Sequence, residues 1–180
     1  GTWHENTYPE VGCDVPNHFY SYSFRPNARW SGYFSSGEEI ANYLETCAAE
    51  FGIVEQIRFN TEVERATYDE DSAQWRVELR LPDGSTEIVT ANVLVSAVGQ
   101  LNRPKMPDLE GLETFEGPAF HTARWQHDVD LSGKRVAVIG TGASAMQLAR
   151  TTADAAERLL IFQRSAQWAA AATAAIPTPL

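Results

Sequence analysis

The sequence contains little cysteine. Only Cys13 and Cys47 occur among its 180 residues, and they lie far apart with no CxxC or CxxH spacing. This pattern excludes a disulfide framework and a thiolate zinc site. No carboxylate or cysteine is arranged with the histidines as metal ligands would be, so we expect no metal. Isolated thiols of this kind are usually buried in a reducing compartment, and the expected location is therefore cytoplasmic.

Positive charge and long apolar runs are also scarce. The chain has 14 Lys and Arg against 24 Asp and Glu, a formal net charge of −10. Nucleic acids and anionic membrane surfaces need a basic face, so neither is an expected partner. No apolar stretch approaches the roughly 20 residues of a membrane span, and no signal peptide follows Gly1. With 43% hydrophobic residues, the composition is that of a globular protein.

The first hundred residues contain a change of hydrophobic period. An aromatic-rich loop over 1–34 precedes a predicted helix over 37–51, which Ser36 and Glu39 would begin as a capping box and Gly52 would end. Alternation of apolar and polar residues then predicts strands, separated by Asp- and Gly-containing turns. The expected strands are a short one at 57–59, an antiparallel meander of 63–68, 74–81 and 85–89, and a strand over 91–98 that is apolar on both faces. Such a strand belongs in the middle of a sheet.

Residues 134–163 form a strand–turn–helix–strand pattern. An apolar strand leads into Gly140-Thr141-Gly142-Ala143-Ser144-Ala145, and an Ala-rich helix and a second strand follow. Gly140 permits the tight turn, Gly142 permits close approach of a pyrophosphate, and Ala145 takes the place of the third glycine of the fingerprint. Free N–H groups at the helix start would bind phosphate. The pattern predicts half of a dinucleotide-binding domain.

The end of the second strand indicates which nucleotide is bound. An NAD site needs an acidic residue there, about 20 residues past the turn, to bind the ribose 2′-OH. The strand ends instead in Phe162-Gln163-Arg164-Ser165. Arg164 could pair with a 2′-phosphate, and Ser165 could add a donor. We therefore expect NADPH.

Several motifs resemble those of one enzyme family. Phe115-x-Gly117-x₃-His121-x₃-Trp125 stands just before the Gly-rich turn. This arrangement resembles the fingerprint of Baeyer–Villiger monooxygenases, which are flavin-containing monooxygenases, and the closest resemblance is to the 4-hydroxyacetophenone type. Gln126 and Glu10 depart from the usual pattern of the family. Further stretches fit in family order: Gly1-Thr-Trp3, Asn6, Tyr8-Pro9, Cys13-Asp14, Tyr20-Ser-Tyr-Ser-Phe24, Ser96-Ala-Val-Gly99-Gln-Leu101 and Phe162-Gln-Arg-Ser165.

The resemblance implies a fold class and a domain order. The fold would be α/β, with two Rossmann-like dinucleotide-binding domains, both incomplete, and an antiparallel meander. The family's flavin pyrophosphate loop and its active-site arginine would lie outside the chain, so we expect an internal fragment that is inactive alone. The expected segments are a flavin-domain part over 1–99 that includes the meander 63–89, a linker over 100–133, the first half of an NADP domain over 134–168, and an irregular tail over 169–180.

The resemblance also implies roles for particular residues. Asp14 would lie near the isoalloxazine, and His121 would act at the site, where a hydrogen-bonding hinge between the domains is favoured over acid–base catalysis. FAD would be lined by Thr2, Trp3, Asp14 and Tyr20, with Val63 on its adenine side. NADP would be held by Thr141, Gly142, Ala143, Ser144, Gln147, Arg164 and Ser165.

The implied reaction uses both cofactors. NADPH would reduce FAD, O₂ would add at the flavin C4a, and the resulting peroxide would convert a ketone into an ester or lactone. Two alternatives stay open at this point. The same scaffold could oxygenate amines or sulfides, or the chain could be a non-catalytic dinucleotide-binding piece. A flavin-type reductase is disfavoured because it would need a redox-active CxxC.

Overall fold

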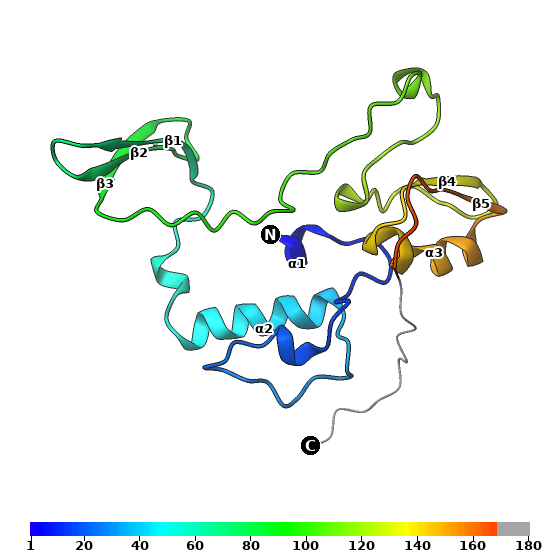
Figure 1. Ribbon diagram of the computed structural model, residues 1–180, viewed down its shortest axis with the longest axis horizontal. Coiled ribbons are helices and arrows are strands. Elements are labelled where there is room, and N and C mark those ends of the chain that lie inside the picture. The colour runs from blue at the N-terminus through cyan, green and yellow to red at the C-terminus, as the bar shows by residue number, and fades with distance from the viewer. Residues whose placement is uncertain (169–180) are drawn as a thin grey trace. The chain divides into compact units, whose positions relative to one another are not determined.

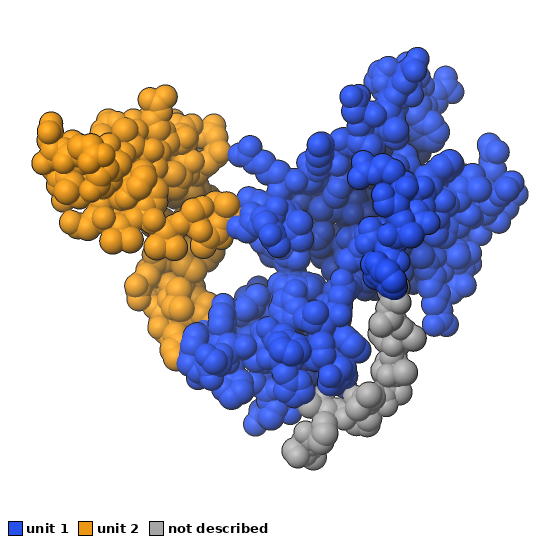
Figure 2. Space-filling model, viewed as in Figure 1, with its two compact units in different colours: residues 1–47, 99–180 blue, residues 48–98 orange. Residues whose placement is uncertain are grey.

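The computed structural model describes residues 1–168, so the tail predicted over 169–180 lies outside the described residues. The chain divides into two compact units, residues 1–47 with 99–180 and residues 48–98 (Figure 2). The predicted flavin-domain part over 1–99 is defined by the cofactor it would bind and stays a prediction. In the described part of the chain, no helix is long and apolar enough to cross a membrane.

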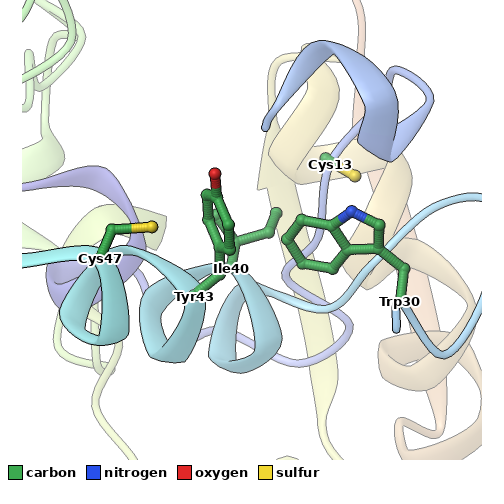
Figure 3. Packing of buried hydrophobic residues seen from close by; sticks show 5 residues of the cluster. All are labelled: Cys13, Trp30, Ile40, Tyr43 and Cys47. Carbon is green, nitrogen blue, oxygen red and sulfur yellow. The ribbon is translucent and has the colours of Figure 1, made fainter. Parts of the chain in front are cut away.

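The best-packed part of the first unit surrounds helix α2 (Gly37–Glu50). Ile40, Tyr43 and Cys47 face one side of this helix at helical spacing and are at most 5% exposed. Figure 3 shows them beside Trp30 and Cys13 from the preceding loop. These contacts anchor the aromatic-rich N-terminal segment, although Phe19 and Phe24 remain exposed. Its only regular elements are the one-turn helix α1 (Thr2–Glu5) and the 3₁₀ turn η1 (Asn17–Phe19).

The predicted capping box of α2 is only half formed. Ser36 Oγ accepts from Glu39 N at 3.2 Å, as expected. The Glu39 carboxylate does not return to the backbone of Ser36 but accepts from Ser31 N and Ser31 Oγ at 2.7 and 2.8 Å. Ser31 of the preceding loop thus takes the place that the Ser36 backbone N–H has in a capping box. The contact links Ser31 to the helix. The helix ends as predicted at Gly52, whose φ of +61° is the left-handed conformation that glycine adopts at helix C-termini.

The second unit contains the predicted meander. Strands β1 (Glu62–Asp69), β2 (Gln74–Arg80) and β3 (Thr86–Ala91) pair antiparallel in that order (Figure 1). On β2 the buried side chains are Val77 and Leu79. They are two residues apart, so they share one face of the sheet, as the alternating pattern requires. The unit also contains the 3₁₀ turn η2 (Val54–Gln56).

Two predicted strands of this unit are wrong. Residues 57–59 follow η2 in irregular conformation, and residues 92–98 pair with no other strand among residues 1–168. Val93, Val95 and Val98 are 72–78% exposed. A segment that is apolar on both faces becomes a strand only between neighbouring strands, and the described chain offers it none.

The first unit also contains the predicted strand–helix–strand pattern. Strands β4 (Arg135–Ile139) and β5 (Arg158–Phe162) pair in parallel, and helix α3 (Ala143–Ala155) connects them (Figure 1). Leu148 and Thr152 are the buried residues of α3. The linker before β4 has only two 3₁₀ turns, η3 (Leu112–Thr114) and η4 (Thr122–Arg124).

Candidate functional site

The Gly-rich turn leaves α3 with an open N-terminus. Gly140 has φ +106°, a conformation that strains residues with a side chain, and its N–H donates to Phe162 O at 2.9 Å. Gly142 is the N-cap, and no side chain caps the helix. The first intrahelical bond runs from Met146 N to Gly142 O at 3.1 Å. The N–H groups of the preceding residues therefore have no helical acceptor and suit an anion.

The two glycines of this turn have open space on the side where a side chain would stand. A Cβ built on Gly140 or on Gly142 would have no neighbour within 4 Å. Neither glycine is thus required by packing within the described chain. The open N-terminus and this free space together fit a phosphate-bearing group.

A cleft of about 520 Å³ lies within the first unit. Its walls combine the first turns of α3 with the N-terminal loop, residues 100–105 and the turn at His121. Eight of the residues assigned from the resemblance line it: Thr2, Trp3, Asp14, Tyr20, His121, Ala143, Ser144 and Gln147. They come from segments more than a hundred residues apart in sequence.

The remaining assigned residues lie elsewhere. Gly140, Thr141, Gly142 and Ala145 belong to the Gly-rich turn but not to the lining of the cleft. Val63 is in β1 of the other unit and is 56% exposed. Arg164 and Ser165 follow β5 and are exposed. Because Ile139 pairs with Phe162 in the parallel ladder, the Gly-rich turn and Arg164 leave the sheet at the same edge.

One wall of the cleft is aromatic. Trp3 and Tyr20 pack edge to face with ring centroids 5.2 Å apart. Burial raises the pKa of the Tyr20 phenol, so the side chain is neutral at physiological pH. Such a wall suits a planar ligand, and Asp14 is an exposed carboxylate beside it.

The cleft includes residues that the sequence analysis did not assign. Tyr8 is 6% exposed and takes part in the lining. Arg103 and Lys105 bring positive charge to a chain that is acidic as a whole. Only their position after the quoted Gln100-Leu101 stretch could have drawn attention to them.

His121 is held by a local bond. Its Nδ1 accepts from Ala123 N at 3.1 Å, which makes it the N-cap of η4. Trp125, at the end of this turn, is half-buried against Phe120 with centroids 5.2 Å apart. Neighbours of His121 make the contacts to the N-terminal segment. Arg124 pairs with Glu5 at 3.0 Å, and His127 Nε2 lies 2.8 Å from Thr7 Oγ1.

Cys13 lies at the edge of the cleft, next to Asp14. The residue is 7% exposed, and its thiol donates to Asn17 Oδ1 at 3.2 Å. Burial raises the pKa of this thiol, which therefore stays protonated and unreactive at neutral pH. Its role is to hold the loop that carries Asp14. Among residues 1–168, no three His, Cys, Asp or Glu side chains gather as metal ligands would.

The family model for flavin-binding monooxygenase-like proteins matches residues 7–178. This chain belongs to that family. Among similar proteins, a Baeyer–Villiger monooxygenase of Streptomyces coelicolor is 48% identical over 168 residues, which cover 93% of this chain and 31% of that protein. The monooxygenase-like chain thus spans about a third of the length of this curated relative.

Solved structures agree with the family. A steroid monooxygenase described as oxidised and bound to NADP is 43% identical, with a TM-score of 0.80 over 93% of this chain and 32% of that one. OTEMO, solved in complex with FAD and NADP, is 37% identical, with a TM-score of 0.80 over 91% and 32% of the two chains. The monooxygenase-like chain is therefore an α/β piece of a Rossmann-type flavoprotein fold that includes an antiparallel meander.

Proposed function

We propose that the protein containing this chain is an NADPH- and FAD-dependent Baeyer–Villiger monooxygenase. One atom of O₂ would enter the bond between a ketone carbonyl carbon and its neighbour, giving an ester or lactone. The other would leave as water, with NADPH oxidised to NADP⁺. The observation that carries the proposal is the shared cleft. It places an uncapped, phosphate-competent helix N-terminus beside an aromatic wall and Asp14.

The residues of the chain would bind and orient both cofactors. Bound FAD would carry electrons from NADPH to oxygen. Trp3 and Tyr20 suit the planar ring system, while the N–H groups at the start of α3 suit the nucleotide phosphates. His121 lines the same cleft and would act there by hydrogen bonding. The contact of Val63 with the adenine side of FAD rests on the resemblance alone.

The reaction class can be tested with three substrates. The purified full-length protein is incubated with NADPH and an aryl ketone, a tertiary amine or a thioether, and the products are identified by mass spectrometry. We expect an ester from the ketone, with NADPH consumption that depends on it. N-oxide or sulfoxide without ester would favour the amine- and sulfide-oxygenating relatives. Absence of substrate-dependent NADPH oxidation would contradict the proposal.

Arg164 would select NADPH over NADH. It follows β5 at the edge of the sheet where the Gly-rich turn also emerges. Loss of a charge-assisted pair with a phosphate costs about 1.5–3 kcal/mol, so Arg164→Ala should raise KM for NADPH about tenfold or more and leave NADH unchanged. Arg158→Ala, at the opposite end of the same strand, is the matched control. Equal changes for both nucleotides in Arg164→Ala would contradict the assignment.

A further inference from the structure

The side-chain amide of Gln147 joins α3 to the loop that carries Asp14. Its Nε2 donates to Gly12 O at 2.9 Å and to Asp14 Oδ1. Its Oε1 accepts from the Tyr8 hydroxyl at 2.8 Å and from Gly12 N at a longer 3.4 Å. Both bonds to Gly12 are to the backbone, so Gln147 pairs with this residue as one strand pairs with another.

These bonds use the full capacity of the amide. A primary amide has two N–H donors and two acceptor lone pairs, and each has a partner here. The orientation of the amide is also fixed, because Gly12 O needs a donor and Gly12 N needs an acceptor. No donor or acceptor remains for a nucleotide. This differs from the direct NADP contact that the resemblance implies for Gln147.

The loop that Gln147 holds is also bonded on its other side, to residues 35–37. Cys13 N donates to Ser35 O at 3.0 Å, and Gly37 N donates to Val11 O at 2.8 Å. A Cβ on Gly12 would lie 2.9 Å from Ser35 O, so only glycine fits between Gln147 and this backbone. The position of Asp14 is therefore determined on one side by residues 35–37 and on the other by Gln147.

We propose that Gln147 is a positioning residue that aims the Asp14 carboxylate into the cleft and couples it to the Gly-rich turn of α3. The inference rests on the proposed function. Gln147 is the fifth residue of α3, so the donor to Asp14 belongs to the same helix whose N-terminus would bind the nucleotide.

The test separates nucleotide binding from positioning. Gln147→Glu keeps the shape and the acceptor but removes both donors, and Gln147→Met removes every hydrogen bond at similar length. In the full-length protein loaded with FAD, we expect the Kd for NADP⁺, measured by calorimetry, to change less than threefold in both variants. Ester formed per NADPH consumed should fall at least tenfold. Thr151→Ala is the matched control, since Thr151 bonds the same loop from the next turn, through Glu10 at 3.3 Å, without contacting Asp14.

A second measurement uses thermal unfolding and needs no turnover. Gln147→Glu sets two carboxylates against each other and should lower the thermal midpoint. Adding Asp14→Asn supplies an N–H donor to the new carboxylate, so the thermal midpoint of the double variant should be higher than that of Gln147→Glu alone.

Three results would overturn the inference. A tenfold or greater rise in the Kd for NADP⁺ with unchanged yield per NADPH would make Gln147 a nucleotide ligand. Unchanged Kd and yield would make it a packing residue. A double variant no more stable than Gln147→Glu would remove the contact with Asp14. If the parent protein oxygenates no substrate, the proposed function fails, but the Kd and the unfolding midpoints still decide whether Gln147 holds Asp14.

Discussion

Replacing Asn17 by Ala should destabilise the loop that carries Cys13 and Asp14. Asn17 is 1% exposed and joins three parts of that loop. Its Nδ2 donates to Gly32 O at 2.6 Å, and its Oδ1 accepts from Ser35 N at 2.8 Å and from the Cys13 thiol at 3.2 Å.

The magnitude follows from the hydrogen bonds that are lost. Asn17→Ala removes the 2.6 Å donor to Gly32 O and the better acceptor of Ser35 N, which keeps a 3.2 Å bond to Cys13 Sγ. A hydrogen bond contributes about 0.5–1.5 kcal/mol net to stability. With these two buried bonds lost, we expect a loss of about 1–3 kcal/mol in the free energy of unfolding. A typical domain is stable by roughly 5–15 kcal/mol, so the loss is measurable.

Urea unfolding followed by tryptophan fluorescence measures this loss, because Trp30 is buried in one cluster with Cys13, which bonds Asn17. Asn42→Ala, at an exposed position of α2, is the control and should change stability by no more than about 0.5 kcal/mol. Asn17→Asp keeps the acceptor but loses the donor to Gly32 O while it is ionised, so its defect should shrink as the carboxyl protonates in acid. An Asn17→Ala protein as stable as the Asn42→Ala control would refute the reasoning.

Two further predictions concern pH. Burial opposes ionisation of Glu39, but hydrogen bonds from serine donors outweigh it and hold the pKa of this carboxyl below 4.5. Its stabilising effect is therefore present above pH 4.5 and lost as the pH falls further, so the stability gap between parent and Glu39→Gln should narrow in acid unfolding experiments. Burial raises the pKa of the Tyr8 phenol above 10.0, so the neutral form stabilises the fold below that pH and the effect is lost as the pH rises through the folded-state pKa. Above pH 10 the thermal midpoint of Tyr8→Phe should therefore fall less steeply with pH than that of the parent. If the midpoints of both proteins fell equally steeply, ionisation of Tyr8 would not cause the loss of stability.

The sequence determined the elements whose signals are local. Apolar spacing and Gly52 defined α2, since a helix bonds within itself and its end needs only one residue in the left-handed conformation. Alternation and short turns defined the meander, whose strands are adjacent in sequence. The Gly-rich turn between an apolar strand and a helix predicted the parallel pair β4 and β5.

Only the tertiary structure decided the contacts between distant segments. Residues 92–98 have the composition of a buried strand, but a strand forms only beside a partner. Glu39 met its capping pattern but bonds Ser31, because a loop brought two better-placed donors to it. Gln147 and Asp14 are 133 residues apart, and no sequence spacing predicts that one amide would bond Tyr8, Gly12 and Asp14 together. Eight residues of the cleft could be named from the sequence because the turn chemistry and the resemblance motifs are local, whereas Arg103 and Lys105 carried no such signal. Which of these side chains bond one another was not, because that depends on how α3 packs against the N-terminal loop.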